Sequence, residues 1–232
     1  MRDWHTGSFT WKNGFDTPSL RKLDEIYFLK PFSMSETKAD FFENMRNMLV
    51  KYGFMQHSRD LLKNTIQGKQ IETSYYLTNF ISYTKAFLDS VAIVLNHFYS
   101  LNRTKGDIDL KHSRFLSEIK SKDPILGNYL GNNSEWIKKV VFLRDEVIHR
   151  KSPLHMYISP SDVNGNPKNL TVKMTMEPVT LFHFEEDKKR ILEKHGKLEQ
   201  DIIEFCENWL KKGEEFIENL SASLLRNRPL ET

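Results

Sequence analysis

The feature that most constrains the fold is a stretch from about Ile71 to Leu101 in which apolar residues recur at every third or fourth position. At 100° per residue these positions fall on one side of a helix, and polar residues form the opposite stripe. The buried side is expected to hold Leu77, Phe80, Ile81, Thr84, Leu88, Val91, Leu95 and Phe98. Lys85 and Asp89, four residues apart, have the spacing of a solvated surface pair. The sequence therefore predicts one long amphipathic helix here.

The scarcity of glycine and proline extends this prediction to the whole chain. Only 10 Gly and 8 Pro occur among 232 residues, too few for the many tight turns of sandwiches and propellers. Apolar residues make up 39% of the chain and charged residues 28%, so enough surface can be buried to exclude a disordered protein. A chain of this length supports one good-sized core with decorations. The expected fold class is mainly α.

Two segments depart from the helical pattern. Residues 1–36 mix Gly, Pro and aromatics without periodicity, which predicts an irregular N-terminal arm on a helical domain at 37–232. The aromatics expected to pack this arm are Trp4, Trp11, Phe15, Tyr27 and Phe28. At about 154–177 the period changes from 3.6 to 2, with the turn-rich segment PSDVNGNPKN between two alternating runs. This pattern predicts a β-hairpin inserted between helices.

Further helices are expected on both sides of the long one. One runs from about residue 35 to 62 with a break near Tyr52-Gly53, and a shorter one from about 113 to 120. Asp123-Pro124 starts another turn or two. The remainder, from about 185 to 226, is expected to form one long helix or two in series, with the bend at Gly213.

Cysteine usage and charge bear on the compartment and the ligand. The single Cys206 lies in an apolar helical context and is expected to be a structural residue in a reducing compartment. Neither a signal peptide nor a run of about 18 apolar residues is found, which predicts a cytoplasmic protein without a membrane partner. The net charge of +3 and pI near 8.8 are compatible with a polyanionic ligand but far from the dense basic footprint of a dedicated nucleic-acid binder.

The helix that opens at Asn133 or Ser134 and ends before Pro153 has two apolar faces. One narrow stripe, which must face the protein's own core, holds Trp136, Val140, Leu143 and Val147. A second arc mixes apolar with ionisable residues: Ile137, Lys138, Val141, Phe142, Arg144, Asp145, Ile148 and His149. Only Lys139, Glu146 and Arg150 are left for open solvent. The second arc is therefore expected to be covered, either by another helix of the same chain or by the same helix of a second subunit.

The end of this helix reads Arg144-Asp145-Glu146-Val147-Ile148-His149. An Arg followed after four to six residues by a His near a helix end, often with a polar residue directly after the Arg, resembles the motif of the HEPN superfamily. The resemblance implies an antiparallel helical bundle that dimerises through this face. It also implies a metal-independent endoribonuclease without a cofactor, in toxin or defence settings, with an antitoxin as a partner.

Helix context rather than spacing selects this pair. Two further pairs have a similar spacing, Arg150 with His155 and Arg190 with His195. The first spans Pro153, which ends the helix, and the second lies among charged residues. Some family members have a Tyr two residues after the His, where this chain has Lys151, so control through modification of that Tyr is not expected.

The chemistry of metal-free RNA cleavage explains the residue types. A base must take the proton of the 2′-hydroxyl, for which imidazole suits neutral pH, and a permanent cation must hold the phosphate oxygens. His149 is the expected base and Arg144 the expected clamp, with Asp145 orienting one of them. Further phosphate contacts are expected from Lys138, Arg150 and Lys151, and dimer contacts from Ile137, Val141 and Ile148. An isologous dimer would bring two copies of Arg144 and His149 around one cleft.

Other interpretations remain open. A capping His and an Arg paired with a carboxylate would make the chain a non-catalytic HEPN-like module for nucleotide or RNA binding or for dimerisation. An enzyme or receptor could instead use a space lined by Met174, Met176, Phe182 and His183, although such a stripe is more often core. Asp107 and Asp109 lack a third ligand at readable spacing, so they are interpreted as a loop and no metal site is predicted.

Overall fold

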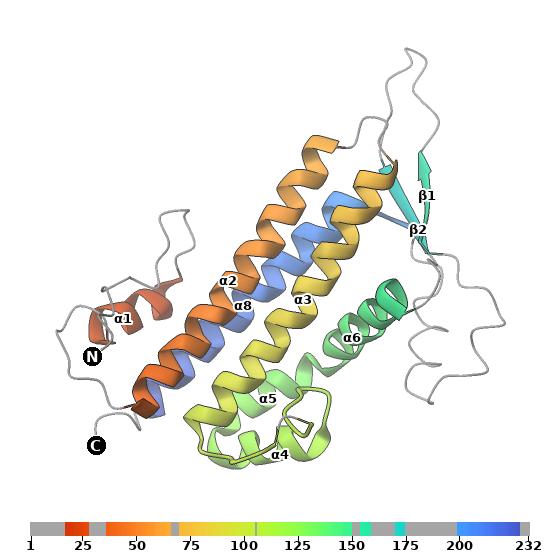
Figure 1. The fold of residues 1–232 in the computed structure, drawn as a ribbon. Coiled ribbons are helices and arrows are strands. Elements are labelled where there is room, and N and C mark those ends of the chain that lie inside the picture. The colour runs from red at the N-terminus through yellow and green to blue at the C-terminus, as the bar shows by residue number, and fades with distance from the viewer. Residues whose placement is uncertain are drawn as a thin grey trace. The chain divides into compact units, whose positions relative to one another are not determined.

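The computed structural model describes residues 17–27, 36–65, 70–104, 106–149, 154–158, 170–174 and 199–227. Over these ranges the chain is mainly helical, as predicted (Figure 1). The helices are α1 (Pro18–Tyr27), α2 (Glu36–Thr65), α3 (Gln70–Phe98), α4 (Ser113–Lys122), α5 (Pro124–Asn132), α6 (Ser134–His149) and α8 (Ile202–Asn227). The strands are β1 (Leu154–Ile158), β2 (Leu170–Met174) and β3 (Glu199–Asp201).

Helix α3 confirms the long amphipathic helix. Every residue expected on its buried side, from Leu77 to Phe98, is at most 5% exposed. Thr84 satisfies its buried hydroxyl by donating to the backbone oxygen of Phe80 at 2.8 Å. The helices expected near residues 113 and 124 are α4 and α5, and the carboxylate of Asp123 caps α5 by accepting the N–H of Leu126 at 3.0 Å.

The N-terminal arm contains a helix that the sequence did not predict. Thr17 accepts the N–H of Leu20 at 3.3 Å, and Pro18 occupies the first turn, where its missing N–H costs nothing. Leu20 and Leu23 are buried on one side of α1. The prediction of an irregular segment was wrong here because the helical spacing of Leu20, Leu23 and Ile26 extends over only ten residues, between segments rich in Gly, Pro and aromatics. Trp4, Trp11, Phe15 and Phe28 lie outside the described residues.

The break expected near Gly53 does not occur, and α8 is one continuous helix across Gly213, the position at which a bend is predicted. Helix α2 continues through Gly53, and α8 continues through the buried Gly213. A glycine costs a helix about 1 kcal/mol relative to alanine. Burial of the apolar side chains near these two glycines stabilises each helix by more than that. Tyr52 is 1% exposed and donates its hydroxyl to the backbone oxygen of Leu210 at 3.3 Å. Packing between α2 and α8 therefore outweighs the local preference.

The strands form one antiparallel sheet in the order β1-β2-β3. Strands β1 and β2 pair with Met156 opposite Val172, and β3 adds to the other edge of β2 with Gln200 opposite Val172. The hairpin prediction contained no third strand. Residues 199–201 were instead expected within the last helix, which begins at Ile202.

The chain packs as two compact units. One takes its described residues from Met1–Val50, Phe87–Ser134 and Lys211–Thr232, and the other from Lys51–Ala86 and Glu135–Leu210. Helices α2, α3 and α8 are each divided between the two units, with one part of the helix in each. In the first unit Phe41 of α2 contacts Phe98 of α3, with ring centroids 5.9 Å apart, and Tyr129 of α5 contacts Phe216 of α8.

The second unit is built around Trp209 of α8. Its ring contacts Phe80 of α3 at 6.3 Å and Trp136 of α6 at 5.9 Å between centroids, so α3, α6 and α8 share one core. On the surface of this unit Arg59 and Lys63 of α2 both bind Glu207 of α8. Cys206 is fully buried, as its apolar context predicts. Among the described helices, none is both long and apolar enough to cross a membrane.

Candidate functional site

The residue directly before helix α6 is held by hydrogen bonds to other residues of the first unit. Asn133, directly before it, is 8% exposed and donates its side-chain amide to the backbone oxygen of Tyr129 at 2.9 Å. Its side-chain oxygen accepts the ammonium of Lys212 at 3.2 Å. These two bonds tie the end of α5 and the side of α8 to the beginning of α6.

The first three turns of α6 are buried on both apolar faces. Val140 and Leu143 are in the core, as the narrow stripe predicts, whereas Trp136 and Val147 are only half-buried. On the second face Ile137 is 1% and Val141 6% exposed within a single chain. These two residues were predicted to form a dimer interface, but the chain's own core already covers them. Of the predicted interface residues only Ile148, at 48% exposed, is open to a second chain.

Arg144 and Asp145 lie where this buried helix becomes exposed. The Arg144 guanidinium donates from Nη1 to Oδ1 of Asp145 at 3.0 Å, and their side chains are 38% and 32% exposed. The structure therefore brings together two of the residues that the sequence singled out, with Ile148 one turn beyond Arg144. His149 is the last residue of α6, and its ring, like Arg150 and Lys151, lies outside the part of the chain that is described.

Two lysines lie earlier on α6. Lys138, predicted to contact phosphate, is half-exposed. Lys139, expected in open solvent, is instead half-buried, and this burial lowers the pKa of its ammonium. The helical wheel missed this burial because it contains no information about neighbouring elements.

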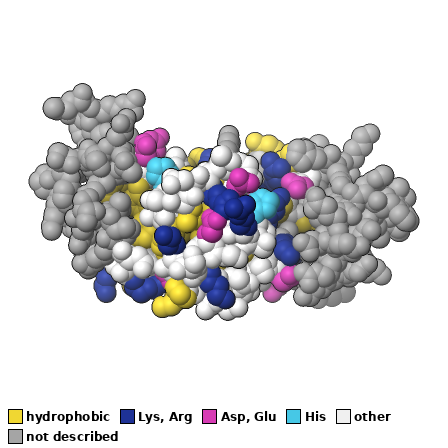
Figure 2. All heavy atoms as spheres, turned by 90° about the horizontal axis from the view of Figure 1, so that it is seen from below, with side chains coloured by type: hydrophobic (Ala, Val, Ile, Leu, Met, Phe, Trp, Pro, Cys, Tyr) yellow, Lys and Arg dark blue, Asp and Glu magenta, His cyan; other side chains and the backbone are white. Residues whose placement is uncertain are grey.

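The described residues on the lower face carry side chains of both charges. Seen from below, Lys and Arg side chains alternate with Asp, Glu and His (Figure 2). Near α4 the guanidinium of Arg103 is bound by Glu118, and Arg114 lies 3.9 Å from the same carboxylate. Among the described residues on that face the basic side chains form no continuous field, which agrees with the modest net charge of +3.

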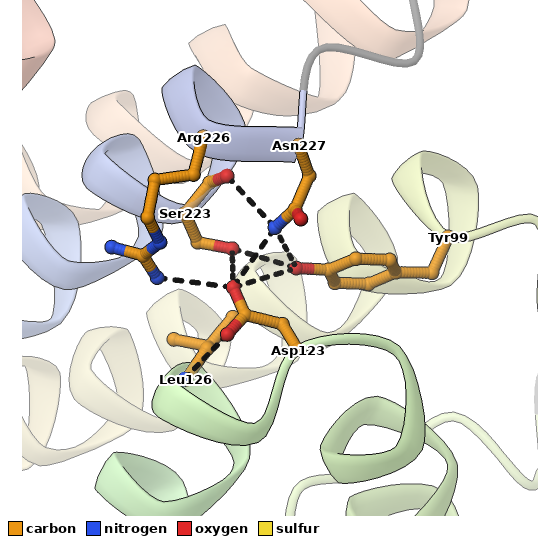
Figure 3. Close-up of polar contacts among 6 residues, drawn as sticks. All are labelled: Tyr99, Asp123, Leu126, Ser223, Arg226 and Asn227. Carbon is orange, nitrogen blue, oxygen red and sulfur yellow. Dashed lines mark hydrogen bonds and ion pairs between the residues drawn. The ribbon is translucent and has the colours of Figure 1, made fainter.

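A second polar cluster, in the first unit, was not predicted. The carboxylate of Asp123 is 4% exposed and accepts hydrogen bonds from three side chains of α8 and from Tyr99 (Figure 3). The donors are Ser223 at 2.7 Å, Asn227 at 3.0 Å, Arg226 at 3.1 Å and Tyr99 at 3.3 Å. Burial and the Asp123 charge raise the pKa of Tyr99 to about 12, so its hydroxyl stays a neutral donor. The carboxylate links the start of α5 to Tyr99 and to the end of α8, so the cluster is a structural joint.

The rival sites gain no support. Asp107 and Asp109 form a turn, in which Thr104 donates to Asp107 at 3.1 Å and the N–H of Lys111 donates to Asp109 at 2.9 Å. The interpretation as a loop is confirmed. Within the described ranges no three His, Cys, Asp or Glu side chains gather as metal ligands would. Met176, Phe182 and His183 and the side chain of Met174 lie outside what is described.

Comparison of the chain with protein-family models, with curated proteins and with solved structures finds no match.

Proposed function

We propose that this protein is a metal-independent endoribonuclease of the HEPN type, acting as a homodimer on RNA. His149 is the base, Arg144 is the phosphate clamp and Asp145 orients the clamp. The wider biological proposal, a toxin or defence effector held in check by an antitoxin in the cytoplasm, follows from the same resemblance.

The observation that carries the proposal is a half-exposed ion pair near the end of a helix whose apolar faces are largely buried. Val140, Ile137 and Val141 are buried, yet one turn later Arg144 keeps 38% of its side chain in solvent. Exposure leaves the guanidinium reachable by a phosphate, and Asp145 at 3.0 Å limits the directions in which it can point.

The proposed reaction needs only these groups and the substrate. The His149 imidazole takes the proton of the 2′-hydroxyl, and the 2′-oxygen forms a bond to the adjacent phosphorus. The bond from phosphorus to the 5′-oxygen breaks, that oxygen takes a proton from solvent water and leaves as a hydroxyl, and the proton on His149 returns to the solvent. Arg144 stabilises the charge that grows on the phosphate oxygens. The products are a 2′,3′-cyclic phosphate and a 5′-hydroxyl.

The test is incubation of the purified protein with mixed RNA in EDTA, beside Arg144→Ala and His149→Ala. Loss of either group should lower the cleavage rate by roughly a hundredfold or more. Two matched controls are Arg114→Ala, whose side chain is 81% exposed on α4, and His57→Ala, exposed on α2. Both controls should cut normally, with cyclic phosphate ends. RNA that stays intact, or cutting that survives both site variants, would reject the proposal.

A second candidate rests on the same ion pair. Asp145 already neutralises part of the Arg144 charge, as expected of a residue that holds an interface rather than a phosphate. The protein would then be a non-catalytic HEPN-like module for dimerisation or for binding nucleotide or RNA. A stable dimer that leaves RNA intact, and that weakens when Arg144 is replaced, would favour this candidate.

A further inference from the structure

The two edges of the three-stranded sheet in the second unit differ in length and charge. Strand β2 lies between the other two, so among the described strands β1 forms one edge and β3 the other. Strand β3 is three residues long, Glu199-Gln200-Asp201, and two of the three are acidic. Strand β1 is five residues long and contains no Asp, Glu, Lys, Arg or Pro. Short, charged edge strands resist pairing with another chain, whereas an edge such as β1 can accept a further strand.

Strand β1 lies close to the surface where the two chains of the proposed dimer meet. It begins five positions after His149, and five residues span at most about 18 Å. Ile148, 48% exposed, is the residue of α6 at which the second chain is expected. An interface of ordinary size, about 800 Å² on each partner, is roughly 28 Å across. One interface can therefore include both Ile148 and the edge of β1 that faces away from β2.

The geometry of an antiparallel pair suits two identical strands. A two-fold axis perpendicular to a sheet turns a strand into its own antiparallel partner, so a residue on that axis lies opposite its own copy. The midpoint of β1 is Met156, with two residues on each side. Pairing about Met156 would form about four to six backbone hydrogen bonds and would bring no two like-charged Asp, Glu, Lys or Arg residues together. Because β3 at the other edge is short and acidic, the assembly would close at two copies.

We propose that β1 pairs with β1 of a second copy, which joins the two three-stranded sheets of the dimer into one sheet of six strands. The inference rests on the proposed function in taking a second copy as the partner, and it adds a backbone interface to the contact expected at Ile148. A strand of another protein is a poorer occupant, because it would compete for the surface on which the proposed dimer depends.

The first experiment uses the natural chain and follows its backbone. In an edge strand every second N–H points away from the neighbouring strand. Hydrogen exchange of each residue of β1 is measured by NMR at one concentration where the chain is a dimer and at one where it is a monomer. In the monomer alternate N–H groups of Leu154–Ile158 should exchange freely, and in the dimer all five should be protected. Alternate N–H groups that stay open in the dimer, or that are already protected in the monomer, would overturn the inference.

A charge-swap experiment tests the register. Met156→Glu and Met156→Lys each place like charges opposite each other at the axis, and each should weaken the dimer Kd by about fivefold or more. Mixing the two variants brings opposite charges together, so the mixed dimer should form more tightly than either variant alone. A mixture that dimerises no better than its components would overturn pairing about Met156.

The opposite edge of the same sheet provides the matched control. Met156 and Gln200 are both paired with Val172, so they lie in one cross-strand row but on different edges. Gln200→Glu and Gln200→Lys should leave the dimer Kd unchanged, alone or mixed. A charge-swap effect of equal size at Gln200 would overturn the assignment of the interface to β1.

The outcomes separate this inference from the proposed function. A dimer that protects the N–H groups of β1 but leaves RNA intact would support the shared sheet and reject the ribonuclease. Cleavage that depends on Arg144, by a dimer in which β1 exchanges as it does in the monomer, would overturn the shared sheet alone. A chain that cuts RNA as a monomer would overturn both the shared sheet and the composite dimer site.

Discussion

The single buried carboxylate of Asp123 binds groups from two helices. It caps α5 through the N–H of Leu126 and also accepts hydrogen bonds from Ser223 and Arg226 (Figure 3). Burial alone would raise the pKa of this carboxyl, but the hydrogen bonds from Ser223, Leu126 and Arg226 outweigh it and hold the pKa at about 2. The ionised form therefore stabilises the fold.

Replacing Asp123 with Asn should lower the free energy of unfolding at pH 7 by about 2 kcal/mol. The amide keeps one acceptor but loses the charge that binds Arg226, and its NH2 group faces other donors. Urea denaturation measures the change. The control is Asp107→Asn, exposed on a surface turn, which should change the stability by less than about 0.5 kcal/mol.

The same carboxylate predicts how stability depends on pH. Because the folded pKa of about 2 lies below the unfolded value of about 4, the contribution is complete above about pH 5 and is lost as pH falls toward 2. The difference between the natural chain and Asp123→Asn should thus be constant from pH 7 to 5 and shrink below. A difference that stays constant down to pH 2 would contradict the assignment of the charge to Asp123.

The sequence predicted only part of this joint. Asp123-Pro124 is a recognisable helix start, and it correctly predicted that α5 begins there. The bonds to Tyr99 and to the end of α8 could not be predicted, because Ser223 lies 100 positions away along the chain. Similarly, the motif singled out Arg144 and Asp145, whose contact is between neighbours in sequence. Contacts between neighbours can be read from one sequence, but contacts that depend on tertiary packing cannot.

At the scale of elements, Gly127 lies where α5 packs closely against α4. A side chain at Gly127 would place its Cβ 2.4 Å from the Cα of Lys120, whereas the space around Gly131, one turn later, is open. Gly127 is buried and Gly131 exposed on the same helix. The two glycines therefore have opposite roles: one permits close packing of α5 on α4, and the other only weakens a helix.

This contrast predicts changes of opposite sign on one helix. Gly127→Ala should lower the free energy of unfolding by about 1–3 kcal/mol, because the backbone of α4 must move. Gly131→Ala should raise it by up to about 1 kcal/mol, because alanine is the better helix former. Thermal and urea unfolding of the two variants measure both changes. Equal effects would show that α4 and α5 do not approach as closely as the structure indicates.

The periodicity of apolar residues predicted the long helix well and failed to predict the short elements. Helix α3 repeats its apolar pattern over 29 residues, and its buried side was predicted residue by residue. Helix α1 repeats its apolar residues over only ten positions, and β3 has no apolar residue in Glu199-Gln200-Asp201. Strand β3 pairs only with β2, so its formation depends on partners that its own sequence does not indicate.

At the scale of the whole molecule, the proposed site is expected to be built by two chains. Positions 144 and 149 are separated by about 140° around α6, so the two positions do not share one face of the helix. Ile148, 48% exposed, lies between them on the helix surface. A second chain placed over Ile148 would bring Arg144 of one subunit toward position 149 of the other, and one phosphate could then contact both.

This arrangement predicts that two inactive variants complement each other. Arg144→Ala and His149→Ala should each fail to cut RNA alone, but an equal mixture, after subunit exchange, should recover cleavage because the mixed dimers join one intact Arg to one intact His. Adding Ile148→Asp to both variants should abolish the recovery, because it places like charges where the subunits meet. Cleavage is measured beside the exchange of differently tagged subunits. A mixture that exchanges but stays inactive would show that Arg144 and His149 act within one chain, and the dimer would then serve stability rather than catalysis.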